Sequence, residues 1–280
     1  MFNYRSYSDL STLILKKLDK FNKYDLFVGI PRSGMIPALM IAHKLNKPVC
    51  DLYSFVRHDE LAVKGGARSD GLNFNIENVN NVLIIDDTIA SGASMAKAEL
   101  FLQENGITNY KTCAIYAIEQ SKSKVDLFLE ILPQPRVFEW NILQCWITDY
   151  AMFDLDGVLC LDPTVDDDGE KYIEYISNAV PNIIPTTRIN TIVTCRLEKY
   201  RDITEKWLSE NNISYDKLIM LPFNTKQERI AWGKHAEYKS EQYKNSSMKL
   251  FVESSKAQAY KIYEITKKPV FCIENNQLIQ

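Results

Sequence analysis

The sequence lacks the features that mark several classes of protein. No apolar stretch reaches the roughly 18–20 residues needed to cross a bilayer, and the first residues show no basic segment followed by an apolar one. The 33 basic and 36 acidic residues give a net charge of −3, and we find neither a basic stripe nor a helix-turn-helix pattern. We therefore expect a cytoplasmic protein with no transmembrane segment and no nucleic-acid partner.

The cysteines and histidines also lack the spacings that mark redox or metal sites. The six cysteines form no CxxC pair, and the three histidines show no spacing typical of metal ligands. Several cysteines lie in apolar runs, as in residues 270–273. We therefore expect buried free thiols in a reducing compartment rather than disulfides or a zinc site.

The length of 280 residues predicts about two domains, and a composition of 46% hydrophobic and 25% charged residues is ordinary for globular proteins. Short apolar runs alternate with helical patterns in both halves, which predicts an α/β protein with two Rossmann-like domains and parallel sheets. The Pro-rich segment 132–136 is the main break in mid-chain. We place the boundary near residue 145, which gives domains 1–145 and 146–280.

The patterns predict the following elements. In the first half, strands are expected at residues 26–30, 49–56, 82–85 and 112–118, and helices at 8–20 (capped by Ser8), at 35–44 and up to about 105. In the second half, strands are expected at 150–153, 191–194, 250–252 and 270–273, and helices at 197–211, 226–244 and 255–266.

The clearest motif of the first half runs from residue 82 to residue 94. Four apolar residues predict a central strand, Asp86 and Asp87 follow it, and a loop rich in hydroxyls then opens a helix. Backbone N–H groups at such a helix start bind anions, and Gly92 lets the backbone approach a ligand closely. Carboxylates suit sugar hydroxyls or a divalent cation rather than phosphate, because like charges repel.

This stretch resembles the 5-phosphoribosyl-1-pyrophosphate (PRPP) signature of type I phosphoribosyltransferases. In that family the paired acids hold the ribose hydroxyls, and the loop binds the 5-phosphate. The resemblance therefore implies that Asp86 and Asp87 hold the ribose of PRPP. The loop residues that it assigns to PRPP are Thr88, Ala90, Ser91, Gly92, Ala93 and Ser94.

Two further segments extend the resemblance. Residues 28–34 look like the pyrophosphate loop of the family, which assigns Arg32, Ser33 and Gly34 to PRPP. Residues 64–71 lie where family members carry a mobile basic flap, and Lys64 and Arg68 are its candidate cations. Stabilising the charge of the departing pyrophosphate would be the main catalytic task.

Two residues bear on the acceptor. Ala90 stands where many purine-handling members carry an acid, which weakens a hypoxanthine or guanine interpretation, although some pyrimidine-handling members also lack that acid. Trp140 lies where some relatives place an aromatic residue against the acceptor. Trp140 could stack on the acceptor or lie at a domain interface, and both interpretations stay open.

The second half has its own motif at residues 152–159. Asp154 and Asp156 alternate at a strand end, so both carboxylates point to one side, and Gly157 permits a sharp exit. Paired carboxylates with Mg²⁺ can form an aspartyl-phosphate. The motif resembles the first motif of haloacid dehalogenase-like (HAD) phosphatases. That resemblance implies that Asp154 is the nucleophile and that Asp156 protonates the leaving alcohol and then activates water.

The remaining HAD motifs follow in order. Thr194 fits the phosphate-binding hydroxyl, Lys239 fits the lysine of the family with Lys234 as its competitor, and Glu253 fits the acidic Mg²⁺ ligand. The metal set that the resemblance implies is Asp154, Asp156 and Glu253. The segment 253–254 reads Glu-Ser where family members often carry two acids or Gly-Asp, which bears on metal affinity. Residues 160–185 leave room for only a small cap, and Arg196 could reach a substrate.

Together the two resemblances imply a bifunctional enzyme. The first domain would transfer 5-phosphoribosyl from PRPP to an acceptor hydroxyl, which we expect to belong to a glycan of a surface polysaccharide, and the second would remove the 5-phosphate. The alternative is a nucleobase phosphoribosyltransferase coupled to a nucleotidase, and a third interpretation is a PRPP-sensing regulator. The sequence leaves the acceptor open, and it leaves open whether the chain forms a homo-oligomer.

Overall fold

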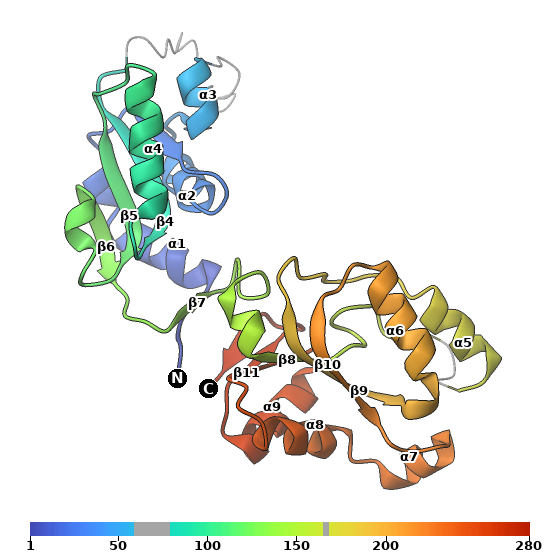
Figure 1. Cartoon of the computed structure of the whole chain (residues 1–280). Helices are drawn as coiled ribbons and strands as arrows, with labels where there is room; N and C mark the ends of the chain where they lie inside the picture. The colour runs from blue at the N-terminus through green and yellow to red at the C-terminus, as the bar shows by residue number, and fades with distance from the viewer. Residues whose placement is uncertain (59–78, 165–167) are drawn as a thin grey trace. The chain divides into compact units, whose positions relative to one another are not determined.

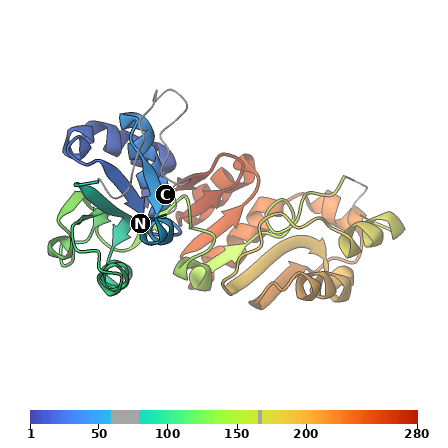
Figure 2. The same ribbon diagram turned by 90° about the horizontal axis from the view of Figure 1, so that it is seen from above.

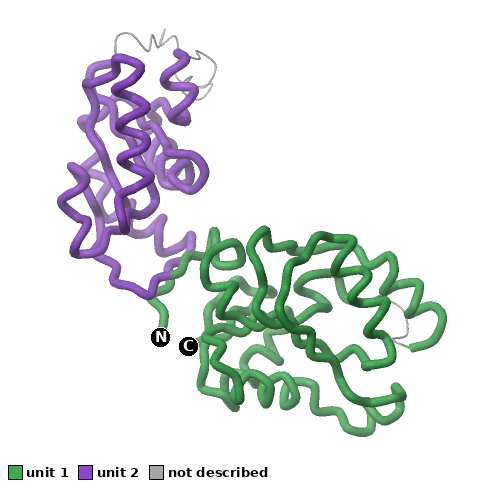
Figure 3. Tube along the Cα trace, viewed as in Figure 1, with its two compact units in different colours: residues 1–4, 137–280 green, residues 5–136 purple. Residues whose placement is uncertain are grey.

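The computed structural model describes residues 1–58, 79–164 and 168–280 (Figure 1). The chain divides into two compact units, one of residues 5–136 and one of residues 1–4 and 137–280 (Figure 3). These units are defined by compactness alone, so the predicted boundary near residue 145 between two functional domains stays a prediction. All six cysteines are free, and four of them are buried, as expected, while Cys145 and Cys195 are partly exposed.

The unit of residues 5–136 is a parallel α/β layer structure. Its elements are α1 (Tyr7–Lys16), β2 (Leu26–Gly29), α2 (Met35–Leu45), β3 (Val49–Asp51), α3 (Leu52–Arg57), β4 (Val82–Ile89), α4 (Ala93–Glu104), β5 (Lys111–Ala117) and β6 (Leu127–Ile131). The strand order is β3-β2-β4-β5-β6, and every neighbouring pair is parallel. The predicted parallel sheet of the first half is therefore confirmed.

Strand β4 lies at the centre of this sheet. Residues 82–85 are buried on both faces, which explains their continuous apolar run. Helix α4 packs against one face through Met95, Ala98 and Leu102, and α2 packs against β2 and β4. Gly29 of β2 is in register with Ile85 of β4. The turn after β2 and the acid pair of β4 therefore lie at the same edge of the sheet.

Three local predictions in this unit were wrong or incomplete. Helix α1 is capped by Ser6 rather than Ser8, because Ser6 and Asp9 form a reciprocal capping box. The strand predicted at 49–56 ends at Asp51, whose carboxylate accepts from the N–H groups of Tyr53 and Ser54 and starts α3. Strand β6 was missed altogether.

The second unit holds a mixed sheet. Its elements are β8 (Ala151–Phe153), α5 (Glu170–Ser177), β9 (Ile189–Leu197), α6 (Arg201–Glu210), β10 (Tyr215–Leu221), α7 (Lys226–Trp232), α8 (His235–Lys244), β11 (Leu250–Glu253), α9 (Lys256–Thr266), β12 (Val270–Cys272) and β13 (Gln277–Ile279). The order is β10-β9-β8-β11-β12-β13, parallel except for β13. Strands β1 (Asn3–Arg5) and β7 (Arg136–Phe138) form a separate pair.

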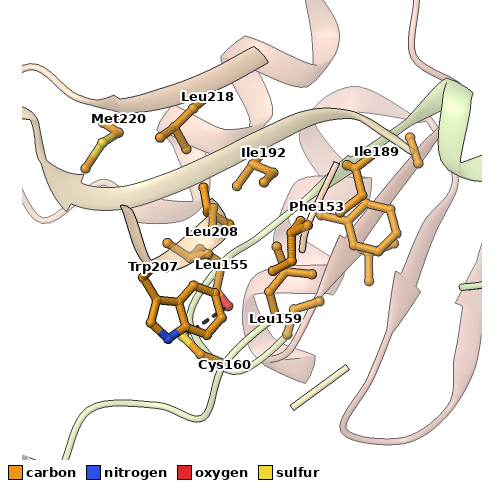
Figure 4. Close-up of a cluster of buried hydrophobic side chains, with 14 of the residues drawn as sticks. Phe153, Leu155, Leu159, Cys160, Ile189, Ile192, Trp207, Leu208, Leu218 and Met220 are labelled. Atoms are coloured by element: carbon orange, nitrogen blue, oxygen red, sulfur yellow. Dashed lines mark hydrogen bonds between the residues drawn. The ribbon is translucent and has the colours of Figure 1, made fainter. Parts of the chain in front are cut away.

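Helices cover both faces of this sheet (Figures 1 and 2). Alternation along β8 sends Met152 into the cluster that α8 and α9 cover, and Phe153 into the cluster that α5 and α6 cover. Figure 4 shows the second cluster, where Trp207 lies with Leu155 and Cys160 among the buried side chains. Strand β8 is thus buried on both faces, and its carboxyl end is fixed between two cores.

The predicted strands of this half are present, with two additions and one break. Strands β10 and β13 were missed, and the helix predicted at 226–244 is two helices, because Gly233 adopts a left-handed conformation with φ of 58° and ends α7. Within the described ranges, no helix has the length and apolar character needed to span a membrane.

Candidate functional site

The acid pair of the first unit is buried at the end of β4. Asp86 and Asp87 are 7% and 2% exposed, and the Asp87 N–H donates to Asp86 Oδ1 at 2.9 Å. Ser33 Oγ, from the turn after β2, donates to Asp87 Oδ1 at 3.0 Å. Burial and the nearby charge of Asp87 raise the pKa of Asp86 to about 8. Without a ligand, the two acids therefore carry one negative charge between them more readily than two.

The loop after the acid pair borders a cavity of about 190 Å³. Residues 88–95 line it together with Asp86 and Arg136. Thr88 Oγ1 is buried with no hydrogen-bond partner among the described residues, and the N-cap of α4 is Gly92, which has no side chain to cap the helix. The N–H of Ala93 donates to Ser91 Oγ at 3.2 Å. An orphaned hydroxyl near a helix start whose N-cap has no side chain fits an oxyanion such as phosphate.

The turn after β2 is held close against the sheet. A Cβ at Gly34 would lie 2.5 Å from Ile85 O and 2.6 Å from Ile30 O, so only glycine fits there. The Pro31–Arg32 peptide bond is cis, and Arg32 is exposed. The structure therefore brings Ser33 and Gly34 to the acid pair, with Arg32 on the surface of the same turn. Lys64 and Arg68 lie outside the described residues.

Two cations near the loop were missed by the sequence analysis. Arg136 is 5% exposed, and its Nη2 donates to Ile89 O at 2.9 Å. Burial lowers the pKa of Arg136, and the charge of Asp87 opposes that shift. Lys124 Nζ donates to Ser91 O at 2.7 Å. Both residues lie more than thirty positions from the loop carbonyls that they contact, so no local pattern could have found them.

Trp140 belongs to the second compact unit. Its ring stacks on Phe138, with the ring centroids 4.8 Å apart and the planes 20° apart. Contact with an acceptor therefore stays a prediction for this residue.

The second candidate site lies at the carboxyl end of the other sheet. Lys239 Nζ donates to Asp154 Oδ2 and to Glu253 Oε2, each at 2.7 Å, and to Gln258 Oε1 at 3.1 Å. Asp154, Lys239 and Glu253 are 5%, 3% and 0% exposed. They come from the end of β8, from α8 and from the end of β11. The fold thus brings together three residues that lie up to 99 positions apart in the sequence.

Burial shapes the protonation of this group. Burial raises the pKa of Asp154 to about 8, against the opposing attraction of Lys239. Burial disfavours the charge of Lys239, but attraction to Asp154 and Glu253 outweighs it and raises the pKa of the lysine. Lys239 therefore stays protonated, and its charge is shared between the two carboxylates. The structure places Lys234 elsewhere, as the exposed N-cap of α8.

Asp156 is paired with a buried arginine. Arg196 Nη2 lies 2.6 Å from Asp156 Oδ1, and Arg196 Nε lies 3.1 Å from Asp156 Oδ2. The Arg196 side chain is fully buried, whereas the Asp156 side chain is 20% exposed. Cys160 Sγ and Thr204 Oγ1 accept further hydrogen bonds from the guanidinium. Arg196 therefore holds Asp156, and because Arg196 also lines the cavity beside these residues, its contact with a substrate stays a prediction.

A cavity of about 330 Å³ opens beside these residues. Asp154, Asp156 and Lys239 line it, and so do Arg229 and His235, which the sequence analysis had not singled out. Thr194 is close by but fully buried. Its Oγ1 accepts from Arg196 N at 3.1 Å, and it is not among the residues that line the cavity.

The donor atoms bear on the predicted Mg²⁺. In the part of the chain that the structure describes, no group of three or more His, Cys, Asp or Glu side chains is arranged to hold a metal ion. The Asp156 carboxylate faces Arg196. Ser254 Oγ lies 3.4 Å from both Asp156 O and Glu253 Oε1. The main-chain oxygen of Asp156 and the carboxylates of Asp154 and Glu253 are hard oxygen ligands, which fit Mg²⁺ in kind.

Comparison with known proteins bears on the first unit. Residues 3–141 match the family model of the phosphoribosyl transferase domain. An orotate phosphoribosyltransferase from Staphylothermus marinus is 34% identical over 98 residues, which cover 34% of this chain and 42% of that protein. The match thus spans less than half the length of this relative.

Solved structures give a more distant likeness. A purine phosphoribosyltransferase from Pyrococcus horikoshii Ot3 is 18% identical, with a TM-score of 0.35 over 49% of this chain and 92% of that one. An orotate phosphoribosyltransferase from Aeropyrum pernix is 21% identical, with a TM-score of 0.30 over 44% and 69%. The family model is therefore the main support, and by that match residues 3–141, which hold the acid pair and its loop, are a phosphoribosyl transferase domain.

Proposed function

We propose that this chain is a bifunctional enzyme that uses PRPP. Its first domain transfers the 5-phosphoribosyl group to an acceptor hydroxyl and releases pyrophosphate. Its second domain, similar to HAD phosphatases, then hydrolyses the 5-phosphate ester. The net product is an acceptor that carries ribofuranose without its phosphate. One observation supports this proposal most directly. A chain with a phosphoribosyl transferase domain also holds Lys239 between the buried carboxylates of Asp154 and Glu253.

The transfer step follows from the geometry at β4. Asp86 and Asp87 would hold the ribose hydroxyls, and the cavity beside residues 88–95 would take the 5-phosphate. Ser33 and Gly34 place the turn after β2 against the acid pair, so the pyrophosphate would lie over this turn near Arg32. Cations and backbone N–H groups there would stabilise the charge that develops on the leaving pyrophosphate. Lys64 and Arg68 are proposed to supply further positive charge that stabilises the leaving pyrophosphate.

The hydrolysis step follows from the second site. Asp154 would attack the phosphorus of the 5-phosphate. Asp156, once released from its ion pair with Arg196 and protonated, would donate the proton that the departing ribose oxygen needs. Water activated by Asp156 would then split the aspartyl-phosphate into phosphate and free Asp154. Lys239 would orient Asp154, and Thr194 would help to bind the phosphate. Asp154, Asp156 and Glu253 would hold Mg²⁺, which supplies charge neutralisation for the phosphoryl oxygens.

The acceptor is proposed to be a glycan of a surface polysaccharide. Ala90 carries no acid that could manage a proton on a purine ring, which favours an acceptor hydroxyl over hypoxanthine or guanine. The cavity beside Asp154 is bordered by a short cap segment with one described helix, α5, which suits a bulky substrate. Trp140 is a candidate for stacking on a sugar face.

A second candidate function is nucleobase phosphoribosyl transfer coupled to a nucleotidase. It is favoured by the 34% identity to an orotate phosphoribosyltransferase over 98 residues. Making and then hydrolysing a nucleotide in one chain would consume PRPP without net gain, which counts against it. A screen of free bases for PRPP-dependent pyrophosphate release distinguishes the two functions.

The test of the proposed function uses cells that carry the Asp154→Ala chain. Mass spectrometry of their glycans should find acceptor that carries ribose 5-phosphate, while cells with the unchanged chain should show ribose alone. Absence of any phosphoribosylated glycan in the variant would contradict the glycan acceptor. A variant at Lys234, the exposed N-cap of α8, serves as the matched control.

A further inference from the structure

The cavity beside the acid pair is lined by a carboxylate that would repel a bound phosphate. Among the described residues that line it, Asp86 and Arg136 are the charged ones, and residues 88–95 contribute none. A phosphate monoester brings a charge of about −1.5 to −2 at neutral pH. Such an anion next to a carboxylate is repelled unless a cation lies close by.

Arg136 is the cation that the fold places in this cavity. It follows β6 and starts β7, and its side chain is buried. Nη2 donates to Ile89 O at 2.9 Å, and Nη1 reaches Leu132 O at 3.5 Å. Two carbonyl groups from different segments therefore hold the guanidinium, and Ile89, the last residue of β4, is one of the residues that line the cavity. The charge of Asp87 also acts on Arg136.

A nearby lysine provides a contrast. Lys124 Nζ also donates to a carbonyl of the loop, Ser91 O at 2.7 Å, but Lys124 is exposed and is not among the lining residues. Water screens an exposed ammonium, whereas a buried guanidinium interacts with a charge in the cavity at a much lower effective dielectric constant. Position, and not only charge, therefore separates the two cations.

We infer that Arg136 is a binding residue for the 5-phosphate of PRPP, which it attracts from the wall of the cavity while it offsets the charge of the acid pair. This inference rests on the proposed use of PRPP and adds a residue to that site. It also explains why a loop made only of neutral residues can take a phosphate next to two carboxylates. Arg136 thereby acts on one end of PRPP, and the turn at residues 31–34 acts on the other.

The experiment measures binding of two ligands by calorimetry in the full chain. Ribose 5-phosphate carries the 5-phosphate, and pyrophosphate carries only the other end of PRPP. Arg136→Met should weaken ribose 5-phosphate binding by at least about tenfold, since a charge-assisted contact is lost. Its affinity for pyrophosphate should stay within about twofold of the unchanged chain. Arg136→Lys, which keeps the charge, should recover part of the lost affinity.

The matched control is Lys122→Met, which removes an exposed lysine that pairs with Glu119 in the same turn as Lys124. It should leave both affinities unchanged. Equal binding of ribose 5-phosphate by Arg136→Met and the unchanged chain would overturn the inference, and so would an equal loss of both ligands, which indicates a structural role. If the unchanged chain binds neither ligand nor PRPP, the proposed function itself fails.

Discussion

Lys239 Nζ lies 2.7 Å from Asp154 Oδ2, and both residues are almost completely buried. The same ammonium group reaches Glu253, so one positive charge is shared by two buried carboxylates. Buried charges of this kind are stable only as a paired group, because each alone has lost its hydration. The relationship therefore joins the stability of the second unit to the chemistry proposed for it.

Replacing the lysine should harm both properties. Lys239→Met leaves Asp154 and Glu253 buried without their cation, and we expect a loss of about 3–5 kcal/mol in the free energy of unfolding. Phosphate release should fall to background. Chemical denaturation and a phosphate assay check the two effects. Lys234→Met, at the exposed N-cap of α8, should change neither, and an equal effect of the two substitutions would contradict this account.

The pair of Arg196 and Asp156 predicts a separation of binding from turnover. Arg196→Lys keeps a positive charge but loses the bidentate contact with Asp156, so the carboxylate is held less firmly. The kcat for phosphate release should fall by at least about tenfold with a much smaller change in KM. Steady-state kinetics on ribose 5-phosphate measure both constants. A change confined to KM would instead assign Arg196 to substrate binding.

The acid pair predicts a pH-dependent effect on stability. The pKa of Asp86 is raised from 3.8 to about 8, so the folded chain binds an extra proton relative to the unfolded chain between about pH 4 and pH 8. Stability from this group is complete below pH 4 and is lost as the pH rises towards 8. Asp86→Asn removes the effect, and its unfolding midpoint at pH 8 should exceed that of the unchanged chain by about 3 °C or more.

The comparison at low pH is the internal control for that prediction. At about pH 3, below the ordinary pKa of 3.8, Asp86 is mostly protonated in both states, so the difference between Asp86→Asn and the unchanged chain should shrink towards zero. Thermal unfolding across the range measures it. A difference that is the same at about pH 3 and pH 8 would show that the substitution acts through packing rather than through charge.

The turn after β2 predicts a steric effect. Gly34→Ala places a Cβ 2.5 Å from Ile85 O, and neither backbone segment can move away without disturbing the central strands. Affinity for pyrophosphate should fall by about tenfold or more, and the chain should lose stability. Calorimetry and thermal unfolding measure the two. Ser94→Ala, on the exposed start of α4, should leave pyrophosphate affinity unchanged.

The sequence predicted the parts of the fold that depend on local patterns. The apolar runs at 82–85 and 250–252 are strands because both of their faces are buried, and such runs are visible without a structure. Strand β6 was missed although four of its five residues are apolar; it lies at the edge of the sheet, and its residues are mostly half-buried. The strand predicted at 49–56 was too long because Asp51 is a helix cap, which the run of apolar residues concealed.

The same distinction between local patterns and distant contacts applies to the residues of the candidate sites. Asp154 and Asp156 follow β8, as their position after an apolar run predicted. Asp86 and Asp87 also come after an apolar run, but they lie within β4, which extends to Ile89 rather than ending at residue 85. Contacts between distant segments could not be predicted, because they depend on how helices and strands pack. The pairing of Asp156 with Arg196 and the position of Arg136 in the phosphate cavity are of this second kind.

The measurement that tests the central claim most directly is the release of pyrophosphate and phosphate from PRPP and acceptor in one reaction. The unchanged chain should release the two in equal amounts. Asp154→Asn should release pyrophosphate at a similar rate and no phosphate, leaving a product that keeps its 5-phosphate. Absence of pyrophosphate from the unchanged chain, or phosphate release that survives in Asp154→Asn, would contradict the account.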